Sequence, residues 1–512
     1  MAHTIDRRAF LTAATAALAA GAAPFAPWVS RAAAQAADAF RPDVEIELEA
    51  RPDEVAVLTG RPTAVWRYAG RVVQGPAEAL QPIAGRYLGP ILRLKKGQKV
   101  RIRFRNRLTQ PSTVHWHGLL VPDRMDGHPR DAIAPGGEYL YEFEVRNRAG
   151  TYWFHPHPHG LTGGQVNAGL AGLFLVTDEA ERALGLPEGE RDIPIVLADR
   201  TFDRDNQLVY VAALGPGMMG TMTGFVGERI LANGRPSFAL EVASAAHRIR
   251  LLNGANSRIY RIARADAKPL VVIGTDGGLL AAPETRPFVV VGPGERVELL
   301  LDLHAESAGS RVALLAQPID FAGTGMMGGM MGRGMMGSGA GPRTGTPHPF
   351  AVFTVARRGP PTTLPARLGE RPPATAPRES RVREFAINVG HMQWGINGRT
   401  FVMDEVAPDE RVRFGDTETW VFRNRTAMMA MPHPMHVHGV QFRVLGRRGT
   451  PRELAWLRQG FIDGGLKDTV LVLPGEEVQV LGRFDAHRGL FLYHCHNLEH
   501  EDMGMMRNFL VA

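Results

Sequence analysis

Apolar and polar residues alternate along several short stretches of the chain. Leu94–Arg107 has a glycine turn followed by an alternating run that includes Asn106 near its end. Val412–Arg425 repeats the same order with Asn424. Because alternation with a period of two is typical of strands with one buried face, both stretches are predicted to form β-strands.

This pattern occurs three times along the chain. Ala243–Asn253 is a middle copy, and a second strand pattern that begins with Pro-Gly follows each copy, at Pro135–Phe143, Pro293–Leu301 and Pro474–Val480. Turn signals between short alternating strands predict antiparallel β-sandwiches. We therefore expect an all-β chain of three β-sandwich domains, at residues 41–180, 190–357 and 380–512, with a proline-rich linker at 359–377.

The N-terminal stretch has the features of an export signal. Thr4–Leu11 contains Arg7 and Arg8 and resembles a twin-arginine signal, with a possible Ala-x-Ala cleavage site at Ala32–Ala34. Residues 1–36 are therefore predicted to be a signal peptide that directs the protein to the periplasm, with no stable membrane insertion after its removal. The formal charge of +7 is spread without a dense basic block, which argues against nucleic-acid binding.

Four His-x-His pairs stand at matching points of the first and third repeats. They are His115/His117, His155/His157, His436/His438 and His494/His496. On a strand, residues i and i+2 project from the same face, so each pair directs two imidazoles to one place. The middle copy has no such pair, so metal sites are predicted between the first and third domains.

The only cysteine of the chain, Cys495, stands between two of these histidines. Its side chain is expected to point to the opposite face of the strand and therefore to bind a different metal ion. His433, His500 and Met505 complete a second set of ligands with it. Two imidazoles, a thiolate and a thioether are typical of a blue copper site, whereas zinc does not require the thioether and iron oxygenases require a carboxylate.

These motifs resemble the copper-binding motifs of the multicopper oxidases, the family of laccase, ascorbate oxidase and cuprous oxidase. The resemblance implies three cupredoxin-like Greek-key domains and four copper ions, one of type 1, one of type 2 and two of type 3. It implies type 1 ligands His433, Cys495, His500 and axial Met505; type 2 ligands His115 and His436; and type 3 ligands His117, His155 and His496 for one ion and His157, His438 and His494 for the other.

The resemblance also implies a reaction in which dioxygen is reduced to water by four electrons that arrive singly. Electrons would enter at the type 1 site and pass through Cys495. Asp126 and Glu501 match acidic positions that the family uses for proton delivery, and Asp123 is an alternative to Asp126.

The electron donor is predicted from methionine-rich segments. The insert at 323–340 contains six of the 20 methionines, Gly215–Met222 is a shorter version, and Met428, Met429, Met431 and Met435 surround His433. Because thioethers select Cu(I), we expect transient Cu(I) binding and oxidation of Cu(I) to Cu(II) for copper tolerance. The chain has Met429 where some cuprous oxidases place an acidic substrate ligand.

Three alternatives remain open. A laccase-like oxidase would take electrons from a small aromatic reductant, such as a phenol or aromatic amine. A copper-storing or copper-delivering protein would consume no dioxygen. A nitrite reductase also has a blue copper, but eight paired histidines in three modules argue against it.

Overall fold

The computed structural model describes residues 40–83, 88–210, 222–319, 346–361, 364–370, 375–377, 379–390, 393–425 and 430–512. Residues 43–512 form one compact unit. Several predictions lie outside the described residues: the signal peptide at 1–36, the methionine-rich insert at 323–340, most of the segment before Met222, and Met428 and Met429.

The described residues form six sheets, two from each of three consecutive stretches of chain. The first sandwich has sheets of order β2-β1-β5-β6 and β3-β4-β8-β7. Its strands are β1 (Val44–Val55), β2 (Thr63–Gln74), β3 (Leu80–Gln81), β4 (Ile91–Lys95), β5 (Lys99–Asn106), β6 (Glu138–Glu144), β7 (Gly150–Phe154) and β8 (Gly172–Thr177). Ile102 on β5 and Phe174 on β8 belong to one apolar cluster, so the core lies between the two sheets.

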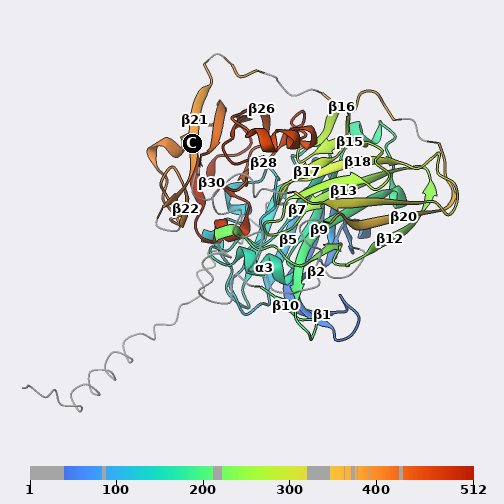
Figure 1. Ribbon diagram of the computed structural model, residues 1–512. Helices are drawn as coiled ribbons and strands as arrows, with labels where there is room; N and C mark the ends of the chain where they lie inside the picture. Colours follow the sequence, from blue (N-terminus) through green and yellow to red (C-terminus); the bar gives the residue numbers. More distant parts are fainter. Residues whose placement is uncertain are drawn as a thin grey trace, which may run out of the picture. The chain divides into compact units, whose positions relative to one another are not determined.

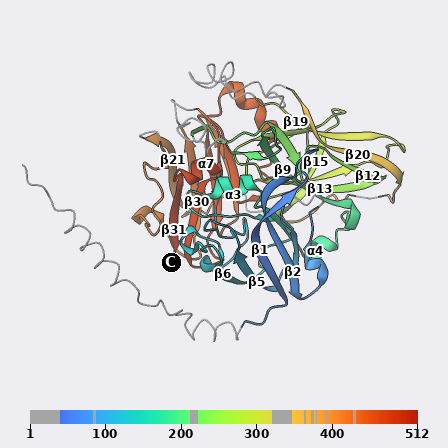
Figure 2. The same ribbon diagram turned by 90° about the horizontal axis from the view of Figure 1, so that it is seen from below.

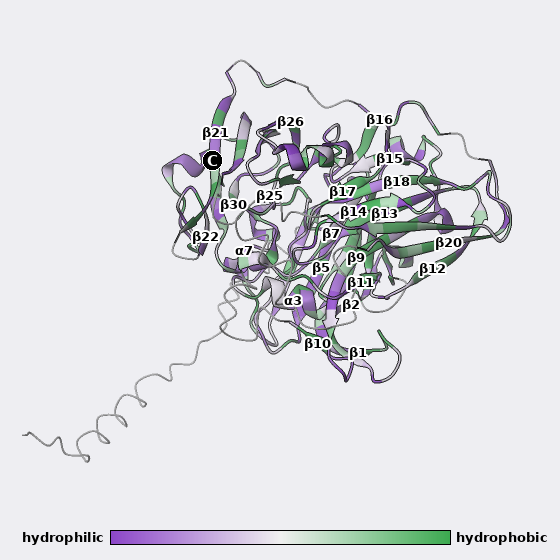
Figure 3. Ribbon diagram, in the orientation of Figure 1, coloured by the Kyte–Doolittle hydropathy of each residue, from purple (hydrophilic) through white to green (hydrophobic). Residues whose placement is uncertain are grey.

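The second sandwich has sheets of order β10-β9-β13-β18-β15-β16, with β11 beside β9, and β12-β20-β19-β14-β17. Its strands are β9 (Asp192–Phe202), β10 (Leu208–Val209), β11 (Arg229–Ala232), β12 (Phe238–Ser244), β13 (Ala246–Asn253), β14 (Tyr260–Arg264), β15 (Leu270–Thr275), β16 (Gly278–Arg286), β17 (Val289–Val291), β18 (Arg296–Asp302), β19 (Arg311–Gln317) and β20 (His348–Arg358). Fully and partly buried residues alternate along β19, and the strands of this sandwich contain both hydrophobic and hydrophilic residues (Figure 3).

The third sandwich has sheets of order β22-β21-β24-β29-β26-β27 and β23-β31-β30-β25-β28. Its strands are β21 (Arg381–Gly390), β22 (Gln393–Ile396), β23 (Arg411–Val412), β24 (Thr417–Asn424), β25 (His433–Val437), β26 (Phe442–Arg448), β27 (Leu466–Lys467), β28 (Thr469–Val472), β29 (Glu477–Arg483), β30 (Gly489–Cys495) and β31 (Met506–Val511). Phe422 on β24 and Phe491 on β30 share its apolar core.

The three sandwiches repeat one strand arrangement. In each, the first long strand runs parallel to a second strand, which pairs antiparallel with a third: β1, β5 and β6; β9, β13 and β18; β21, β24 and β29. The buried asparagines that end the second strands, Asn106, Asn253 and Asn424, each donate to two backbone oxygens at 2.7 to 3.2 Å. The predicted all-β repeat is confirmed, whereas the exact domain boundaries stay a prediction.

Helices are few among the described residues and connect the strands. The α-helices are α3 (Thr162–Ala168), α4 (Glu179–Arg182) and α7 (Leu498–Asp502), and the 3-10 helices are η1 (Ala77–Ala79), η2 (Asp123–Met125), η3 (Pro129–Asp131), η4 (Gly189–Arg191), η7 (Pro408–Glu410) and η8 (Arg452–Gly460). None of the helices in these parts of the chain is long and apolar enough to cross a lipid bilayer.

The first and third sandwiches meet where α3 lies beside α7 (Figures 1 and 2). The backbone N–H groups of Thr162 and Gly163 in α3 donate to the carboxylate of Asp502 in α7 at 2.9 and 2.8 Å. His128, in the loop after β5, lies with its Nε2 2.8 Å from Oδ1 of Asn508 on β31. These buried polar contacts hold the two histidine-bearing sandwiches together.

Candidate metal centre

Five groups of buried side chains bring potential metal ligands together in the described part of the chain: four consist of histidines and Cys495, and the fifth combines His115, Asp126 and His438. The ligand atoms of each group lie within 4.8 Å of one another. The four groups of histidine and cysteine are His115, His117 and His436; His117, His155 and His496; His157, His438 and His494; and His433, Cys495 and His500. Each of the first three contains residues of both the first and the third sandwich, and the fourth belongs to the third sandwich alone.

Strand pairing creates these groups from residues that are distant in sequence. His115 and His155 form an isolated β-bridge, with N–H to O distances of 2.8 and 3.1 Å in the two directions. In the third sandwich, His436 on β25 stands opposite His494 on β30, and Met435 stands opposite Cys495. Antiparallel pairing therefore brings His-x-His pairs side by side.

Backbone oxygens fix the tautomers of several histidines. Nδ1 of His115 donates to the carbonyl of Asp126 at 2.7 Å, Nδ1 of His436 to that of Asp468 at 2.8 Å, and Nδ1 of His155 to that of Pro156 at 2.9 Å. With the proton on Nδ1, Nε2 keeps its lone pair and is a potential metal ligand. Nε2 of His115 and of His436 has no hydrogen-bond partner among the described residues.

The group of His157, His438 and His494 fits a cation particularly well. Nε2 of His494 lies 3.1 Å from Nε2 of His438 and 3.3 Å from Nε2 of His157. Burial lowers the pKa of all three, to about 3 for His494, so the rings are neutral. Nδ1 of His438 donates to Asp126 and Nδ1 of His494 to the carbonyl of Cys495, so the Nε2 atoms of these two rings face each other with lone pairs. Lone pairs this close repel each other unless a cation lies between them, so these residues fit a metal ion.

The sulfur of Cys495 lies on the other side of its strand from its histidine neighbours. Sγ is 3.5 Å from Nδ1 of His433 and 3.6 Å from Nδ1 of His500, and it accepts a hydrogen bond from the backbone N–H of Asn497 at 3.4 Å. Burial raises the pKa of the Cys495 thiol. A buried thiolate therefore needs a compensating cation, which two neutral imidazoles and a sulfur would hold as a soft ligand set.

Met505 lies next to this group. Its backbone carbonyl accepts from the N–H of Cys495 at 3.1 Å, and its N–H donates to the carbonyl of His500 at 2.9 Å. Its side chain is fully buried in the apolar cluster that also contains Cys495. Its neighbours differ: Met506 packs in a different apolar cluster, and Met503 is only half-buried. The axial role of Met505 stays a prediction.

The second sandwich also contacts the cysteine-containing group, although it has no ligand in it. The backbone carbonyl of Met222 accepts from Nε2 of His500 and from Nε1 of Trp394, each at 3.0 Å. The Trp394 ring centroid is 4.9 Å from that of His500. This contact fixes the His500 tautomer with Nδ1 toward Cys495, and nothing in the sequence pattern indicated it.

The predicted acidic residues lie beside the histidine groups. Oδ2 of Asp126 accepts from Nδ1 of His438 at 2.6 Å, and Oε2 of Glu501 is 3.2 Å from Nδ1 of His494. Burial raises the pKa of Glu501 well above its ordinary value. The alternative residue Asp123 is instead partly exposed in η2, where it pairs with Arg130 at 2.7 Å.

Asp468 contacts two of the candidate ligands and was not predicted. Its Oδ1 is 3.0 Å from Nε2 of His117, and its carbonyl holds His436 as described above. Its only sequence signal is its place before strand β28, because His117 is 351 positions away. Of the unassigned histidines, His128 and His247 are buried and hydrogen-bonded, whereas His159 packs against Phe401.

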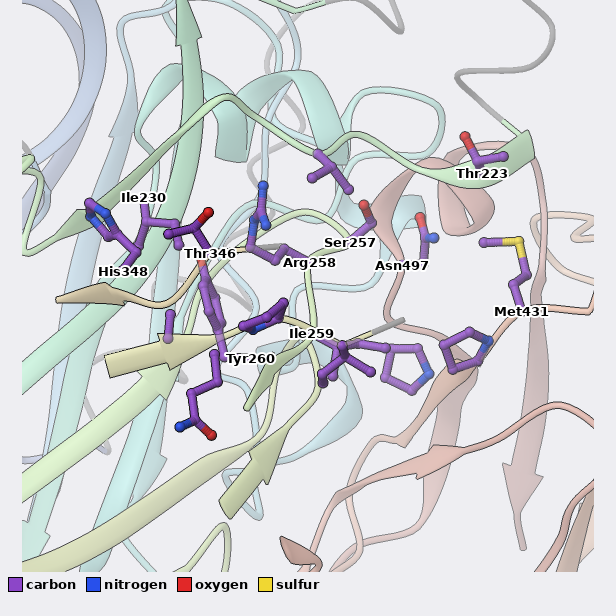
Figure 4. A pocket seen from close by; sticks show the side chains of 17 residues that line it. Thr223, Ile230, Ser257, Arg258, Ile259, Tyr260, Thr346, His348, Met431 and Asn497 are labelled. Carbon is purple, nitrogen blue, oxygen red and sulfur yellow. The ribbon is translucent and has the colours of Figure 1, made fainter. Parts of the chain in front are cut away.

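A pocket of about 290 Å³ lies between the second and third sandwiches, next to His433 (Figure 4). Pro432 and Pro434, on either side of His433, line it, as does Asn497. His348, Arg258, Tyr260 and Gln317 of the second sandwich line it as well. The pocket therefore gives a small molecule access to the neighbourhood of the cysteine-containing group.

The methionines predicted to surround His433 have different surroundings. Met431 is half-buried and lines the pocket. Met435 is fully buried in the apolar core, opposite Cys495 on the neighbouring strand, so it forms part of the hydrophobic wall. Met428 and Met429 lie outside the described residues.

Comparisons with known proteins agree with this geometry. Two family models, both described as multicopper oxidase, match residues 67–181 and 371–512. The multicopper oxidase mco of Staphylococcus aureus is 30% identical over 84% of this chain and 83% of its own length. A laccase of Bacillus stratosphericus is 28% identical over 87% of this chain and 90% of its own length.

The fold is also that of a solved multicopper oxidase. The crystal structure of McoA from Aquifex aeolicus has a TM-score of 0.76 and 31% identity, covering 92% of this chain and 97% of that protein. This likeness confirms the cupredoxin-type all-β fold expected from the sequence. The chain therefore belongs to the multicopper oxidases, a family of copper-dependent oxidoreductases that use dioxygen and a reducing substrate.

Proposed function

We propose that this protein couples the one-electron oxidation of Cu(I) to Cu(II) to the four-electron reduction of dioxygen to water. The observation that carries the oxidase assignment is the convergence of four ligand groups within one compact unit. Bound copper would supply the one-electron redox couple and the oxygen-reducing chemistry. In this proposal one type 1, one type 2 and two type 3 ions occupy these groups.

The proposed role of each residue depends on the ligand group to which it belongs. His433, Cys495 and His500, with Met505 as the axial ligand, would hold the type 1 ion. Cys495 is bonded through the backbone to both His494 and His496, which belong to the histidine-only groups. A single residue thus gives electrons a covalent path between the two kinds of site.

The histidine-only groups would hold the remaining three ions, with ligands taken over from the family motifs. His115 and His436 would bind the type 2 ion. One type 3 ion would use His117, His155 and His496, and the other His157, His438 and His494. Glu501, and Asp126 through Oδ1, the oxygen that does not accept from His438, would relay the protons that dioxygen reduction consumes, since these carboxyl groups lie next to His494 and His438.

The choice of Cu(I) as the electron donor rests on the thioether sulfurs of methionine residues. The insert at 323–340 holds six methionines in a glycine-rich sequence, and Met431 contributes a thioether to the pocket beside His433. Thioethers are ligands that favour Cu(I) over harder ions. Nε2 of His433 is buried and has no hydrogen-bond partner among the described residues.

Deletion of residues 323–340 tests whether Cu(I) is the electron donor. Steady-state oxidation of Cu(I) and of a phenol should be measured before and after the deletion, with copper content as a control for an intact metal centre. We expect Cu(I) turnover to fall while phenol turnover stays equal or rises. If Cu(I) turnover were unchanged, the insert would no longer support Cu(I) as the electron donor.

A small aromatic reductant is the second candidate donor, and the pocket favours it. A cavity of about 290 Å³ is much larger than a bare ion requires and matches the lower end of small-molecule sites. Tyr260, Ile259 and Pro434 provide apolar lining, and His348 and Gln317 provide polar groups. For a laccase-like enzyme, the deletion would leave phenol turnover equal or higher and would not lower Cu(I) turnover.

We further propose export to the periplasm by the twin-arginine route, where the enzyme would contribute to copper tolerance. Arg7 and Arg8 in Thr4–Leu11 support this proposal. Fusion of residues 1–36 to a reporter, with Arg7 and Arg8 replaced by lysine as the control, tests the route. A copper-storing protein, the non-catalytic alternative, would consume no dioxygen with any reductant.

A further inference from the structure

Arg296, a buried arginine of the second sandwich, contacts all three sandwiches. Its Nε donates to the carbonyl of Thr151 on β7 of the first sandwich at 2.9 Å. Its Nη1 and Nη2 donate to the two carboxylate oxygens of Asp468 in the third sandwich at 2.7 and 2.5 Å. The other two N–H groups donate to the carbonyls of Gly294 and Asp276, so all five donors of the guanidinium are used.

Asp468, the partner of Arg296, holds two histidines of one group. Its Oδ1 accepts from Nε2 of His117 at 3.0 Å, which leaves Nδ1 of His117 with a lone pair. Its backbone carbonyl accepts from Nδ1 of His436 at 2.8 Å. The rings of His117 and His436 stack at 3.8 Å between centroids, and both belong to the group that also contains His115.

We propose that Arg296 is a positioning residue through which the second sandwich, which contributes no residue to the four groups of histidine and cysteine, sets the geometry of the type 2 and type 3 copper sites. This inference rests on the proposed function of those sites. The planar guanidinium fixes both oxygens of Asp468, and Asp468 in turn fixes the orientation of His117. A lysine would keep the charge but could not form this two-point contact.

The second sandwich holds the Asp468 segment at further points. Oδ2 of Asp276 is 3.1 Å from Nζ of Lys467 and accepts weakly from the backbone N–H groups of Asp468 and Thr469 at 3.4 Å. Oδ1 of Asp276 accepts from the N–H of Arg296 at 2.7 Å. The loop before β16 and the start of β18 thus hold one short segment of the third sandwich.

Two glycines show how little space the arrangement leaves. A Cβ at Gly294 would lie 3.0 Å from ring atoms of His496 and 3.1 Å from Cε1 of His117. A Cβ at Gly118 would collide with the carboxylate of Asp468 and lie 2.8 Å from Nη2 of Arg296. Because both backbones have positive φ angles of 83° and 84°, glycine suits them for conformational reasons as well.

The test compares Arg296→Lys with Arg250→Lys. Arg250 is a matched control because it is equally buried in the second sandwich, pairs with Asp192 at 2.6 Å, and donates to Oγ1 of the same Thr151 at 3.2 Å, but has no contact with Asp468. Each protein should be loaded with copper and then titrated with a chelator. Blue absorption reports the cysteine-containing site, and electron paramagnetic resonance reports type 2 copper.

We expect Arg296→Lys to keep the blue absorption of the parent. Its histidine-held copper should leave at about 10- to 100-fold lower chelator concentration, the effect usual for loss of a ligand's hydrogen-bond partner. Its type 2 resonance should shift, whereas Arg250→Lys should match the parent in all three measurements. Parent-like copper retention and resonance in folded Arg296→Lys would overturn the inference, as would an equal loss of both kinds of copper.

Asp468→Asn decides the question if Arg296→Lys does not fold. This substitution keeps the shape of the side chain but removes one of the oxygens that accept from Arg296. The same selective loss of histidine-held copper would support the inference. Parent-like copper retention would overturn it. A loaded parent without blue absorption would contradict the proposed function instead. Chelator titration of the histidine-held metal still decides the role of Arg296 in that case.

Discussion

Oδ2 of Asp126 lies 2.6 Å from Nδ1 of His438, a residue 312 positions later in the chain. The carboxylate belongs to the loop after β5 in the first sandwich, and the histidine follows β25 in the third. This bond fixes the tautomer in which Nε2 of His438 faces Nε2 of His494. One side chain therefore joins two sandwiches and orients a candidate copper ligand.

Asp126→Asn should lower dioxygen uptake by about 10- to 100-fold, because the amide is a weaker acceptor and cannot hold a proton for transfer. Dioxygen consumption with a saturating reductant measures this effect. The control is Asp123→Asn, since Asp123 is near in sequence but pairs with Arg130. If both substitutions lowered dioxygen uptake equally, the cause would be a disturbed loop after β5 and not the lost contact between Asp126 and His438.

Cys495→Ser should abolish both the blue absorption and dioxygen uptake, while the histidine-only groups keep their copper. The hydroxyl replaces the soft sulfur that lies 3.5 and 3.6 Å from the two imidazole nitrogens. Absorption spectra and copper analysis check this prediction. Met435→Leu is the control, because Met435 fills the core opposite Cys495 and a swap of similar volume should cost less than about 1.5 kcal/mol.

Val226→Trp should narrow the pocket beside His433. Val226 lines the pocket and is 40% exposed, so a larger side chain can be accommodated without disturbing a core. If aromatic donors bind there, KM for a phenol should rise about tenfold, which corresponds to about 1.4 kcal/mol of binding free energy. Val73→Trp, at another exposed position on β2, should leave KM unchanged. Equal KM values for both variants would place phenol oxidation elsewhere.

Asp192 should make the copper-free protein sensitive to acid. Burial acts to raise its pKa, but Arg250 at 2.6 Å, together with Arg248 and Arg93, outweighs burial and lowers the pKa below 3.8. The unfolded chain therefore binds a proton first as the pH falls. The stabilisation is fully present above pH 3.8 and is lost as the pH falls through the lower pKa of the folded state.

Asp192→Asn should then cost about 3 to 5 kcal/mol at pH 7, because it leaves Arg250 without its nearest counter-charge in a buried site. Thermal unfolding from pH 7 to pH 3 checks the prediction, and the variant should show a shallower loss of stability in acid than the parent. Glu47→Gln breaks an exposed pair with Arg71 and should change stability by less than about 1 kcal/mol. A parent and an Asp192→Asn variant with parallel acid profiles would contradict this account.

The repeat and the direction of the ligand side chains could be predicted from the sequence. Asn106, Asn253 and Asn424 end equivalent strands because each repeat has the same local pattern of turn, alternation and asparagine. The same period of two predicted that Cys495 faces away from its neighbours. Short-range sterics determine such features, so they can be read from a few adjacent residues.

The contacts around the ligands could not be predicted in this way. Asp468 meets His117 from 351 positions away and Arg296 from 172 positions away. Asp468 stands in no repeated motif of the sequence. Arg296 lies within the repeated stretch Pro293–Leu301, but an arginine in a strand pattern is usually a solvated surface residue. The half-buried Met431 and the core residue Met435 were likewise indistinguishable in the sequence, because burial depends on which sheet covers them.

The sequence by itself determined the number of repeated β-sandwich units, the residue types available to hold copper, and the face of the strand on which each lies, because these depend on the local backbone period. Only the tertiary structure decided which histidines meet, which nitrogen of each ring is free, and that the second sandwich, which contributes no residue to the four groups of histidine and cysteine, reaches the site through Arg296 and the carbonyl of Met222. Those features arise from the packing of three separate cores against one another, and distant residues become neighbours only when that packing is complete.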